Sequence, residues 1–263
     1  MATQVSRASI HPSAIVHPDA DLAADVEVGP YSVVSEHVRI GRGTRVGSHC
    51  VIEGRTVIGQ DNEIFTGAVV GSVTQDKKYD GGESYLLIGD RNKIREYVTI
   101  NPGTKAGTET VIGNDNLIMA YAHVAHDCIV KDRAVLANAA TLAGHVVVED
   151  GAIIGGLSGV HQFVRVGSLA IVGGCSKLVQ DGPPFIMVDG HPARSYGLNT
   201  VGLERNGIDA GARMVLKRAF KIIFRSGLSL PTAIQRIESE VTDHEVVRQL
   251  LAFLKASHRG ICK

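Results

Sequence analysis

Aliphatic residues recur at every sixth position over most of the chain. In steps of six from Ile10 to Leu178, all but three of the 29 positions hold Ile, Val or Leu. An α-helix repeats apolar residues about every 3.6 positions and a half-buried strand about every 2, so this period fits neither element alone. A strict six-residue period is typical of the parallel β-helix built from hexapeptide repeats. The pattern therefore predicts a solenoid that ends near residue 178.

The period also predicts the size of one turn. Hexapeptide solenoids form triangular coils of roughly 18 residues with three short strands each, and they wind left-handed against the usual right-handed crossover rule. Neighbouring coils then stack about 4.8 Å apart. Small residues follow most of the aliphatic positions after four residues, where two faces of the triangle converge. Cys50 and Cys128 share this slot, so we interpret them as structural fillers rather than reactive thiols.

Two short intervals interrupt the pattern. The three exceptions are Asp76, Gly82 and Ala106, which fall in the stretches of about 72–86 and 103–110. We expect both stretches to project from the stack as loops. Loops on a rigid scaffold commonly carry function.

The pattern becomes helical in the C-terminal part. Residues 209–226 predict a helix, and Gly227 is expected as its C-cap. A second helix is expected to begin near residues 229–231, and a third after Thr242 or Asp243.

Together these patterns predict a mainly β fold with two domains. A left-handed parallel β-helix of hexapeptide repeats is expected over residues 1–190, followed by a small C-terminal α-helical domain over residues 191–263.

Composition narrows the class of protein. Of the 263 residues 44% are hydrophobic, but only 5% are aromatic and Trp is absent, so small aliphatic side chains must fill the core. The four cysteines are scattered and predict reduced thiols rather than a disulfide framework. Neither a signal peptide nor an apolar stretch of membrane-spanning length is visible, so we expect a cytoplasmic protein without a membrane span.

Charge divides along the chain although the net charge is +0. Residues 1–199 hold 16 Lys+Arg against 21 Asp+Glu, a balance of −5, whereas residues 200–263 hold 11 against 6, a balance of +5. Such asymmetry indicates an acidic partner for the tail.

That partner would meet a basic stripe on the first predicted helix. Its members step by four residues with one more beside them: Arg213, Lys217, Lys221, Arg225 and Arg218. The alternative interpretation is an ordinary solvent-exposed helix face without a partner. Because the stripe contains no acidic residue, we favour docking of an acidic protein.

Histidines gather in the middle of the predicted solenoid. Stacked coils place residues 18 apart above one another, so His126 shares a column with Gly144 and Gln162, and Asp127 shares the next with His145. The set His123, His126, His145 and His161 occupies positions that do not point into the core. The four histidines could lie together on the surface by chance, but their concentration in so few coils favours a chemical role.

One chemistry fits this grouping without a metal or another cofactor. A neutral imidazole can accept a proton from a hydroxyl at physiological pH, so His126 is the candidate general base. Asp127 can orient that ring, and the backbone N–H of Gly144 can stabilise a developing oxyanion. Because no Ser or Cys is implicated as a nucleophile, the pattern favours direct transfer.

Two other classes of protein, a zinc enzyme and a binding scaffold, are also compatible with this pattern. Histidines between subunits of a hexapeptide-repeat trimer can hold zinc, as in the γ-class carbonic anhydrases, although their ligand spacing differs from the His-x-x-His here. A binding scaffold without chemistry is the third possibility.

Several stretches resemble a known enzyme family, the UDP-N-acetylglucosamine O-acyltransferases of lipid A biosynthesis. The matching stretches are "TQDKKY" (74–79), "IGDRNKIREYVTI" (88–100), "AHVAHDC" (122–128), "LAGHV" (142–146), "IIGGLSGVHQF" (153–163), "VGGCS" (172–176) and "GLNTVGLERNG" (197–207). One hexapeptide is weak evidence, but this ordered set covers nearly the whole chain. The N-acylating enzyme of the same pathway has an extra N-terminal domain before its repeats, and because the period here already begins at Ile10 we expect the O-acylating family instead.

The resemblance implies transfer of an (R)-3-hydroxyacyl group from acyl carrier protein to the glucosamine 3-hydroxyl of UDP-N-acetylglucosamine, the first step of lipid A biosynthesis. It implies a homotrimer with the site between subunits, and neither a nucleic-acid partner nor a metal. His126 matches the general base of the family, Asp127 its orienting residue and Gly144 its oxyanion donor. Positions that match substrate-binding residues are Asp76, Lys78, His123, His145, His161, Gln162, Asn199 and Arg205.

One departure concerns the nucleotide end of the site. Many relatives have consecutive basic residues there, whereas Glu204 and Asn206 flank a lone Arg205 in this chain. The length of the acyl chain does not follow from the sequence, because one side chain in a narrow tunnel can set it.

Overall fold

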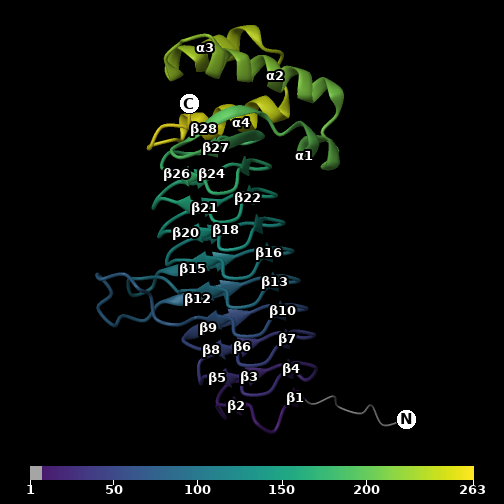
Figure 1. Cartoon of the computed structure of the whole chain (residues 1–263), viewed down its shortest axis with the longest axis vertical. Helices are drawn as coiled ribbons and strands as arrows, with labels where there is room; N and C mark the ends of the chain where they lie inside the picture. The colour runs from purple at the N-terminus through teal and green to yellow at the C-terminus, as the bar shows by residue number, and fades with distance from the viewer. Residues whose placement is uncertain (1–7) are drawn as a thin grey trace.

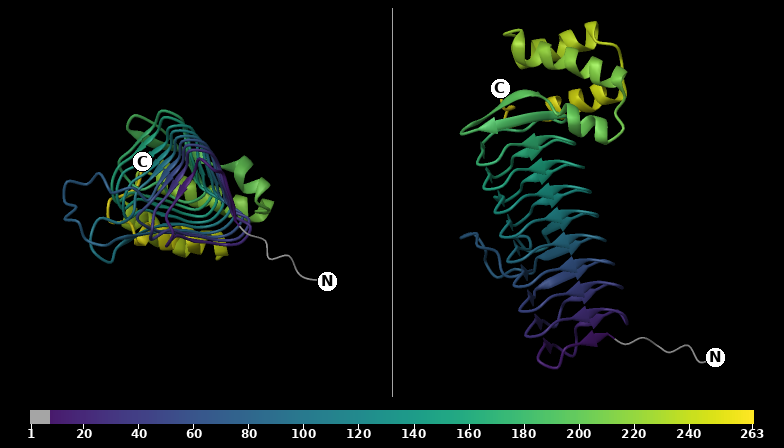
Figure 2. Two further views of the ribbon diagram at one scale, coloured as in Figure 1. Left: turned by 90° about the horizontal axis from the view of Figure 1, so that it is seen from below. Right: turned by 45° about the vertical axis from the view of Figure 1, so that its right-hand side comes forward.

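The chain folds into a tall triangular prism covered at one end by helices. The computed structural model describes residues 8–263, so the first seven residues of the predicted β-helix domain lie outside the described part. Figure 1 shows the coils stacked along the long axis, and the view along that axis in Figure 2 shows their triangular outline. The predicted fold class, a left-handed parallel β-helix with a helical C-terminal region, is confirmed.

Each side of the prism is one sheet of short strands. The first sheet, named sheet A, contains β1 (Ser9–Ile10), β4 (Glu27–Val28), β7 (Arg45–Val46), β10 (Glu63–Ile64), β13 (Lys93–Ile94), β16 (Leu117–Ile118), β19 (Val135–Leu136), β22 (Ile153–Ile154), β25 (Ile171–Val172), β27 (Ile186–Gly190) and β28 (Ala193–Leu198). Sheet B contains β2 (Ile15–Val16), β5 (Val33–Val34), β8 (Val51–Ile52), β11 (Val69–Val70), β14 (Thr99–Ile100), β17 (His123–Val124), β20 (Thr141–Leu142), β23 (Gly159–Val160) and β26 (Lys177–Leu178). Sheet C contains β3 (Asp21–Leu22), β6 (Arg39–Ile40), β9 (Arg55–Ile58), β12 (Tyr85–Ile88), β15 (Glu109–Ile112), β18 (Ile129–Val130), β21 (Val147–Val148) and β24 (Arg165–Val166).

The core is the column of aliphatic residues that the period marks. From Val28 upward these side chains point inward and are almost completely buried, as at Ile118, Leu136 and Ile154. The small residues at the corners are buried as well, and Cys128 is among them. Burial raises the pKa of the Cys128 thiol to about 12, so this sulfur stays protonated and packs as a small apolar group.

Two loops leave the stack without disturbing its register. Ile64 pairs with Ile94 and Ile94 with Ile118, so the spacing between vertical neighbours lengthens from 18 residues to 30 and then 24. The excess over 18 is a whole multiple of six in both cases. Residues 71–84 and 101–108 carry this excess, and Figure 1 shows them projecting from one side of the prism.

An antiparallel hairpin closes the top of the stack. Strand β27 pairs in parallel with β25 below it and antiparallel with β28. The hairpin straddles the domain boundary placed at residue 190 by the sequence pattern. It separates the apolar core of the prism from a second core between the helices.

Four helices follow in the described part of the chain: α1 (Thr200–Arg205), α2 (Ala210–Arg225), α3 (Leu230–Glu240) and α4 (Glu245–Lys255). The side chains of Asp209 and Ser229 cap α2 and α3 by accepting hydrogen bonds from backbone N–H groups. Helix α4 begins later than the pattern indicated, because His244 rather than Thr242 or Asp243 is its N-cap. The short helix α1 was not predicted. No helix among residues 8–263 is long and apolar enough to cross a membrane.

Replacing Leu136 by Ala should destabilise the chain by about 2–5 kcal/mol, since the side chain is fully buried and its removal leaves a cavity inside a stacked coil. Met214 is 71% exposed on α2, so Met214→Ala removes a similar number of atoms and should change the free energy of unfolding by less than about 0.5 kcal/mol. Denaturant unfolding of both variants measures the difference, and equal destabilisation would contradict this account of the core.

Candidate active site

The histidines meet at one corner of the prism, between sheets B and C. Strand β17 ends at Val124, and the next residues turn the corner toward β18. Asp127 adopts a left-handed backbone conformation there, with φ 57°, and its vertical neighbours His145 and Phe163 do the same at φ 61° and 64°. Asp accepts this conformation more readily than most residues do. The repeated corner therefore stacks equivalent side chains on the outer surface.

A short hydrogen bond fixes the ring of His126. Its Nδ1 lies 2.7 Å from Oδ2 of Asp127, and the backbone N–H of Thr104 donates to the same oxygen at 3.2 Å. A carboxylate can only accept, so Nδ1 carries a proton, and in the neutral ring Nε2 is the nitrogen that can accept one. The second projecting loop thus helps to hold the carboxylate that orients the ring.

Asp127 stays ionised although its side chain is only 10% exposed. Burial opposes ionisation, but hydrogen bonds from His126, Thr108 and the Thr104 amide outweigh it and lower the pKa of this carboxyl below its ordinary value. The negative charge beside Nδ1 will stabilise an imidazolium if His126 takes up a proton at Nε2.

The free nitrogen of His126 faces Gly144 and the first projecting loop. Nε2 lies 3.6 Å from Oδ2 of Asp76, and a Cβ placed on Gly144 would come within 2.4 Å of Nε2. Only glycine leaves room for the ring at this position. Among the described residues nothing accepts a hydrogen bond from the Gly144 N–H, which is therefore free to bind an oxygen atom of a ligand.

These groups line a hollow of about 540 Å³, which we call the histidine hollow. Its lining residues are Gln75, Asp76, Lys77, Lys78, Asn101, His123, Ala125, His126, Ala143, Gly144 and Gln162. Six of these were predicted as site residues: Asp76, Lys78, His123, His126, Gly144 and Gln162. Asn101 was missed, although it follows the last strand before the second loop and its side chain donates to the Ser72 carbonyl in the first loop.

Two further predicted histidines flank the hollow. His145 stacks on Phe163 with ring centroids 4.5 Å apart and meets the edge of the His126 ring at 5.1 Å. His161 is exposed and lies one coil above Ala143, because the amide of Ala143 bonds to the carbonyl of Val160.

The remaining two predicted substrate residues lie at a different place. Asn199 is buried as the N-cap of α1, where its side chain donates to the carbonyl of Leu169. Leu169 belongs to the corner between sheets C and A, not to the corner of the hollow. Arg205 ends α1. Within one chain, neither residue joins the histidines.

The basic stripe lines a second hollow of about 500 Å³ beside α2, named the α2 groove. Four of its five predicted members line the groove together with the apolar side chains of Leu198, Met214 and Phe220; these members are Arg213, Lys217, Lys221 and Arg225. Arg218 is exposed beside them. The sequence pattern did not predict one acidic neighbour of the stripe: a carboxylate oxygen of Glu204 in α1 lies 3.9 Å from the guanidinium of Arg213.

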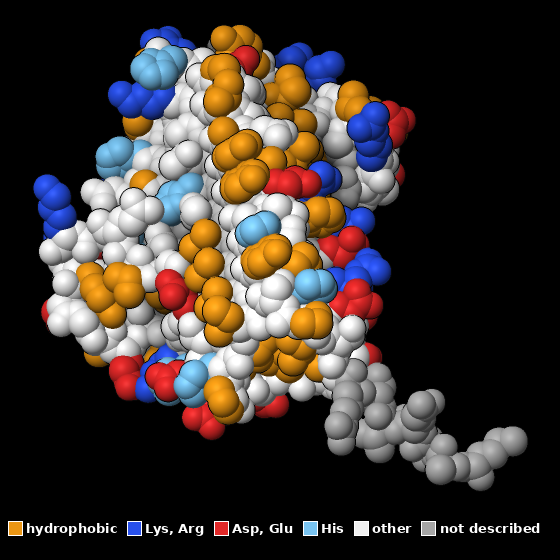
Figure 3. Space-filling view, turned by 60° about the horizontal axis from the view of Figure 1, so that its bottom comes forward, with side chains coloured by type: hydrophobic (Ala, Val, Ile, Leu, Met, Phe, Trp, Pro, Cys, Tyr) orange, Lys and Arg blue, Asp and Glu red, His pale blue; other side chains and the backbone are white. Residues whose placement is uncertain are grey.

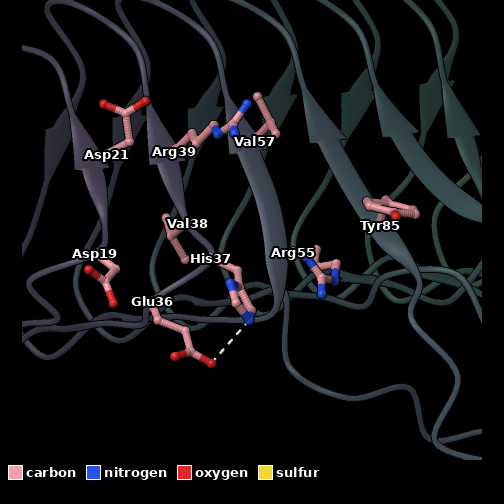
Figure 4. A pocket seen from close by; sticks show the side chains of 9 residues that line it. All are labelled: Asp19, Asp21, Glu36, His37, Val38, Arg39, Arg55, Val57 and Tyr85. Carbon is pink, nitrogen blue, oxygen red and sulfur yellow. Dashed lines mark ion pairs between the residues drawn. The ribbon is translucent and has the colours of Figure 1, made fainter.

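A third hollow of about 390 Å³ lies on sheet C near the N-terminal end of the stack. Figure 4 shows its acidic and basic side chains spread along successive coils, with His37 turned to Glu36 at 3.0 Å. Because these charges lie apart and His37 already has a partner, the hollow lacks the convergent groups of the histidine hollow.

Burial affects the two neighbouring histidines in the same direction. Burial, and then the nearby His126, lower the pKa of His123 below its ordinary value. Burial also lowers the pKa of His145, although the charge of Asp127 acts against this change. Both rings are thus neutral at physiological pH and present one donor and one acceptor each.

The geometry of His126, Asp127 and His145 also bears on a metal. Their ligand atoms all lie within 4.8 Å of one another. Two ligands of a tetrahedral zinc ion are about 3.4 Å apart, whereas Nδ1 of His126 and Oδ2 of Asp127 are 2.7 Å apart. That pair has the spacing of a hydrogen bond rather than of two zinc ligands.

Comparison with known proteins identifies relatives along the whole chain. The family model described as UDP-N-acetylglucosamine O-acyltransferase, domain 2, matches residues 181–262, and the model of the bacterial transferase hexapeptide repeat matches residues 19–54 and 109–144. An acyl-(acyl-carrier-protein) UDP-N-acetylglucosamine O-acyltransferase of Thermodesulfovibrio yellowstonii is 50% identical over 255 residues, which cover 97% of this chain and 99% of the relative.

Solved structures agree with this match. LpxA from Acinetobacter baumannii superposes with a TM-score of 0.94 at 43% identity, covering 97% of this chain and 99% of that one. The UDP-N-acetylglucosamine O-acyltransferase of Moraxella catarrhalis gives 0.92 at 40% identity with the same coverage.

The lowered pKa values of His123 and His145 predict how stability depends on pH. Below the ordinary imidazole pKa of about 6.5 the unfolded chain takes up protons before the folded chain does. Their contribution to stability is therefore fully present above that pH and is lost as the pH falls toward the lower pKa values of the folded state. Thermal unfolding between pH 7.5 and 5.5 should show this loss, and His123→Gln should reduce its slope. An unchanged slope in that variant would contradict the assignment.

Proposed function

The chain belongs to the family of UDP-N-acetylglucosamine O-acyltransferases, and we propose that it transfers an (R)-3-hydroxyacyl group from acyl carrier protein to the glucosamine 3-hydroxyl of UDP-N-acetylglucosamine, as the first step of lipid A biosynthesis. The observation that carries this proposal is the orientation of His126. Its Nδ1 is bonded to Asp127, and its Nε2 faces the histidine hollow beside the Gly144 amide.

In the proposed reaction His126 acts as the general base. Nε2 accepts the proton of the sugar 3-hydroxyl while the oxygen attacks the thioester carbonyl carbon, and Asp127 stabilises the imidazolium that forms. The Gly144 N–H donates to the carbonyl oxygen as it becomes negative. The C–S bond then breaks, the carrier thiolate takes the proton back from His126, and the ester and a free thiol remain.

The nucleotide sugar is proposed to lie across the hollow. Lys78 in the first loop supplies a positive charge for it, while Asp76 lies where it can accept from a sugar hydroxyl. The other predicted contacts around the hollow are His123, His145, His161 and Gln162. Asn199 and Arg205 lie at another corner of the same chain, so we propose that a neighbouring copy supplies them.

A homotrimer provides that arrangement, because threefold rotation brings one corner of each prism to a different corner of its neighbour. The outer surface supports association. Tyr121 is 64% exposed, and Tyr97, Ile129 and Val57 also remain exposed on the outside of the coils. Figure 3 shows apolar side chains gathered in streaks along the stack. Tyr97 and Tyr121 stack at the corner between sheets A and B with ring centroids 5.2 Å apart, and exposed apolar groups gathered in this way are typical of an interface.

Acyl carrier protein is proposed to dock at the α2 groove. Four basic side chains surround an apolar floor that contains Met214 and Phe220. This combination suits an acidic, amphipathic protein surface, because charge directs the approach and apolar contact holds it.

A zinc-dependent hydratase is the second candidate, and the cluster of His126, Asp127 and His145 is the observation that favours it. The 2.7 Å hydrogen bond within that cluster weighs against it. A chelator separates the two candidates, because transfer by His126 as a base continues in its presence.

The test of the acyltransfer is incubation with UDP-N-acetylglucosamine and (R)-3-hydroxyacyl carrier proteins of several lengths, followed by product mass. His126→Ala should lower kcat by about 10² to 10⁴ while the oligomeric state stays that of the wild type. His37→Ala is the matched control, since His37 lies at the same kind of corner but outside the histidine hollow. Wild-type activity in His126→Ala, or activity that a chelator abolishes, would contradict the proposed mechanism.

Reversing the charge of Lys217 and Arg218 to Glu should raise the KM for the acyl carrier protein about tenfold and leave the KM for UDP-N-acetylglucosamine unchanged. The reason is that two exposed charges of the proposed docking surface become repulsive to an acidic partner. Lys255→Glu is the control, because this cation lies on α4 in an ion pair with Glu238. Equal KM values for the carrier in all three proteins would remove the docking role.

A further inference from the structure

The C-terminal segment after α4 returns to the β-helix and reaches the neighbourhood of the histidine hollow. Its backbone pairs with Asp181, whose N–H donates to the Gly260 carbonyl and whose carbonyl accepts from the Cys262 N–H, both at 2.9 Å. Ser257 donates to the Asp181 carboxylate at 2.7 Å, and Ser195 donates to the Cys262 carbonyl at 2.6 Å. The segment is therefore held at several points along its length.

Arg259 is the residue that this segment presents to the predicted site. Its Nη2 lies 3.3 Å from Nδ1 of His161, and its Nε donates to the carbonyl of Val179 at 3.4 Å. Its own carbonyl accepts from the side chain of Gln180 at 3.3 Å. The Val179 carbonyl thus holds the guanidinium, and Gln180 holds the backbone of the same residue.

Nδ1 of His161 has two neighbours that demand opposite protonation. The carbonyl oxygen of Gln162 lies 3.2 Å away and can only accept, which requires a proton on Nδ1. The guanidinium of Arg259 can only donate, which requires a bare Nδ1. One imidazole nitrogen cannot satisfy both partners at once, so the ring must choose between two tautomers.

We propose that Arg259 is a positioning residue that holds His161 in the neutral tautomer with the proton on Nε2. The guanidinium can only donate hydrogen bonds, so its position beside the ring favours a bare Nδ1. His161 then offers Nε2–H as a fixed hydrogen-bond donor above the histidine hollow, where it can bind an acceptor atom of the substrate.

This inference rests on the proposed function, because it assigns His161 a role toward the substrate of that site. It adds Arg259 to the residues that support the site, although Arg259 is 98 positions from His161 in the sequence and acts only through it. Loss of Arg259 should let Nδ1 take the proton and bond to the Gln162 carbonyl. Nε2 then becomes an acceptor, and the donor to the substrate is lost.

The experiment compares the wild type with Arg259→Gln and with the control Arg248→Gln, which removes an exposed arginine of α4 that is paired with Asp243. Proteins labelled with ¹⁵N-histidine are examined at pH 8, where imidazole is neutral, and the His161 signals are assigned through their absence in His161→Ala. We expect a proton on Nε2 in the wild type and in the control, and on Nδ1 in Arg259→Gln. A proton on Nε2 in all three would overturn the proposal.

Kinetics supply an independent readout. Arg259→Gln should lower kcat/KM about tenfold, the scale of losing one hydrogen bond to a ligand. In the background of His161→Ala it should cause no further loss, because a residue that acts through His161 has nothing left to act on. Losses that multiply in the double variant would overturn the proposal. Absence of acyltransfer in the wild type would instead refute the proposed function, and the tautomer measurement would still decide the role of Arg259.

A thiol count shows whether the segment stays docked. Cys175 is exposed, whereas Cys262 lies within the docked segment and is buried, so one fast-reacting thiol is expected in the wild type and in Arg259→Gln. If Cys262 reacts in that variant, Arg259→Lys decides instead, because it keeps a cationic donor. A proton on Nε2 and near-normal kcat/KM in Arg259→Lys would support the proposal, and a proton on Nδ1 would overturn it.

Discussion

Vertical register between stacked coils is the constraint on which the rest of the structure depends. Each strand is only two to six residues long, so no strand is stable alone and each coil is held by the coils above and below it. Inward aliphatic side chains bury the apolar surface, and backbone hydrogen bonds between coils hold equivalent residues of successive turns directly above one another. A slip by one residue would turn the aliphatic column outward and expose it to water.

The same register creates the site. It brings His126 and Gly144 into one column so closely that a single methyl group on the glycine would touch the ring. The two projecting loops can be expelled because their lengths preserve the register. The first loop contributes Asp76 and Lys78 to the hollow, and the second contributes the Thr104 amide that holds Asp127. The regular stack thus carries the groups of the candidate site at a corner, where side chains point away from the core.

The left-handed backbone of the corners adds a second consequence. Asp127, His145 and Phe163 share this conformation, which directs their side chains outward in one file. Going up the stack, the carboxylate of Asp127 binds His126, and the imidazole of His145, whose pKa is lowered, lies one coil above it. The ring of Phe163 stacks on that imidazole from the next coil.

The sequence by itself determined the solenoid, the size of its coil and the grouping of His126, Asp127 and Gly144. These follow from a local period that repeats without ambiguity, and a fixed period converts distance along the chain into height in the stack. The sequence pattern did not predict helix α1 or the start of α4 at Glu245, because a few local hydrogen bonds set short helices and helix ends.

Only the tertiary structure decided contacts between segments that no period relates. The separation of Asn199 from the histidine hollow, the approach of Glu204 to Arg213 and the return of Arg259 to His161 are of this kind. Each depends on how the helical region packs on the last coil, and that packing comes from apolar surfaces of irregular shape rather than from a repeat. A periodic pattern can specify neighbours within the stack, but not the place where an aperiodic tail comes to rest on it.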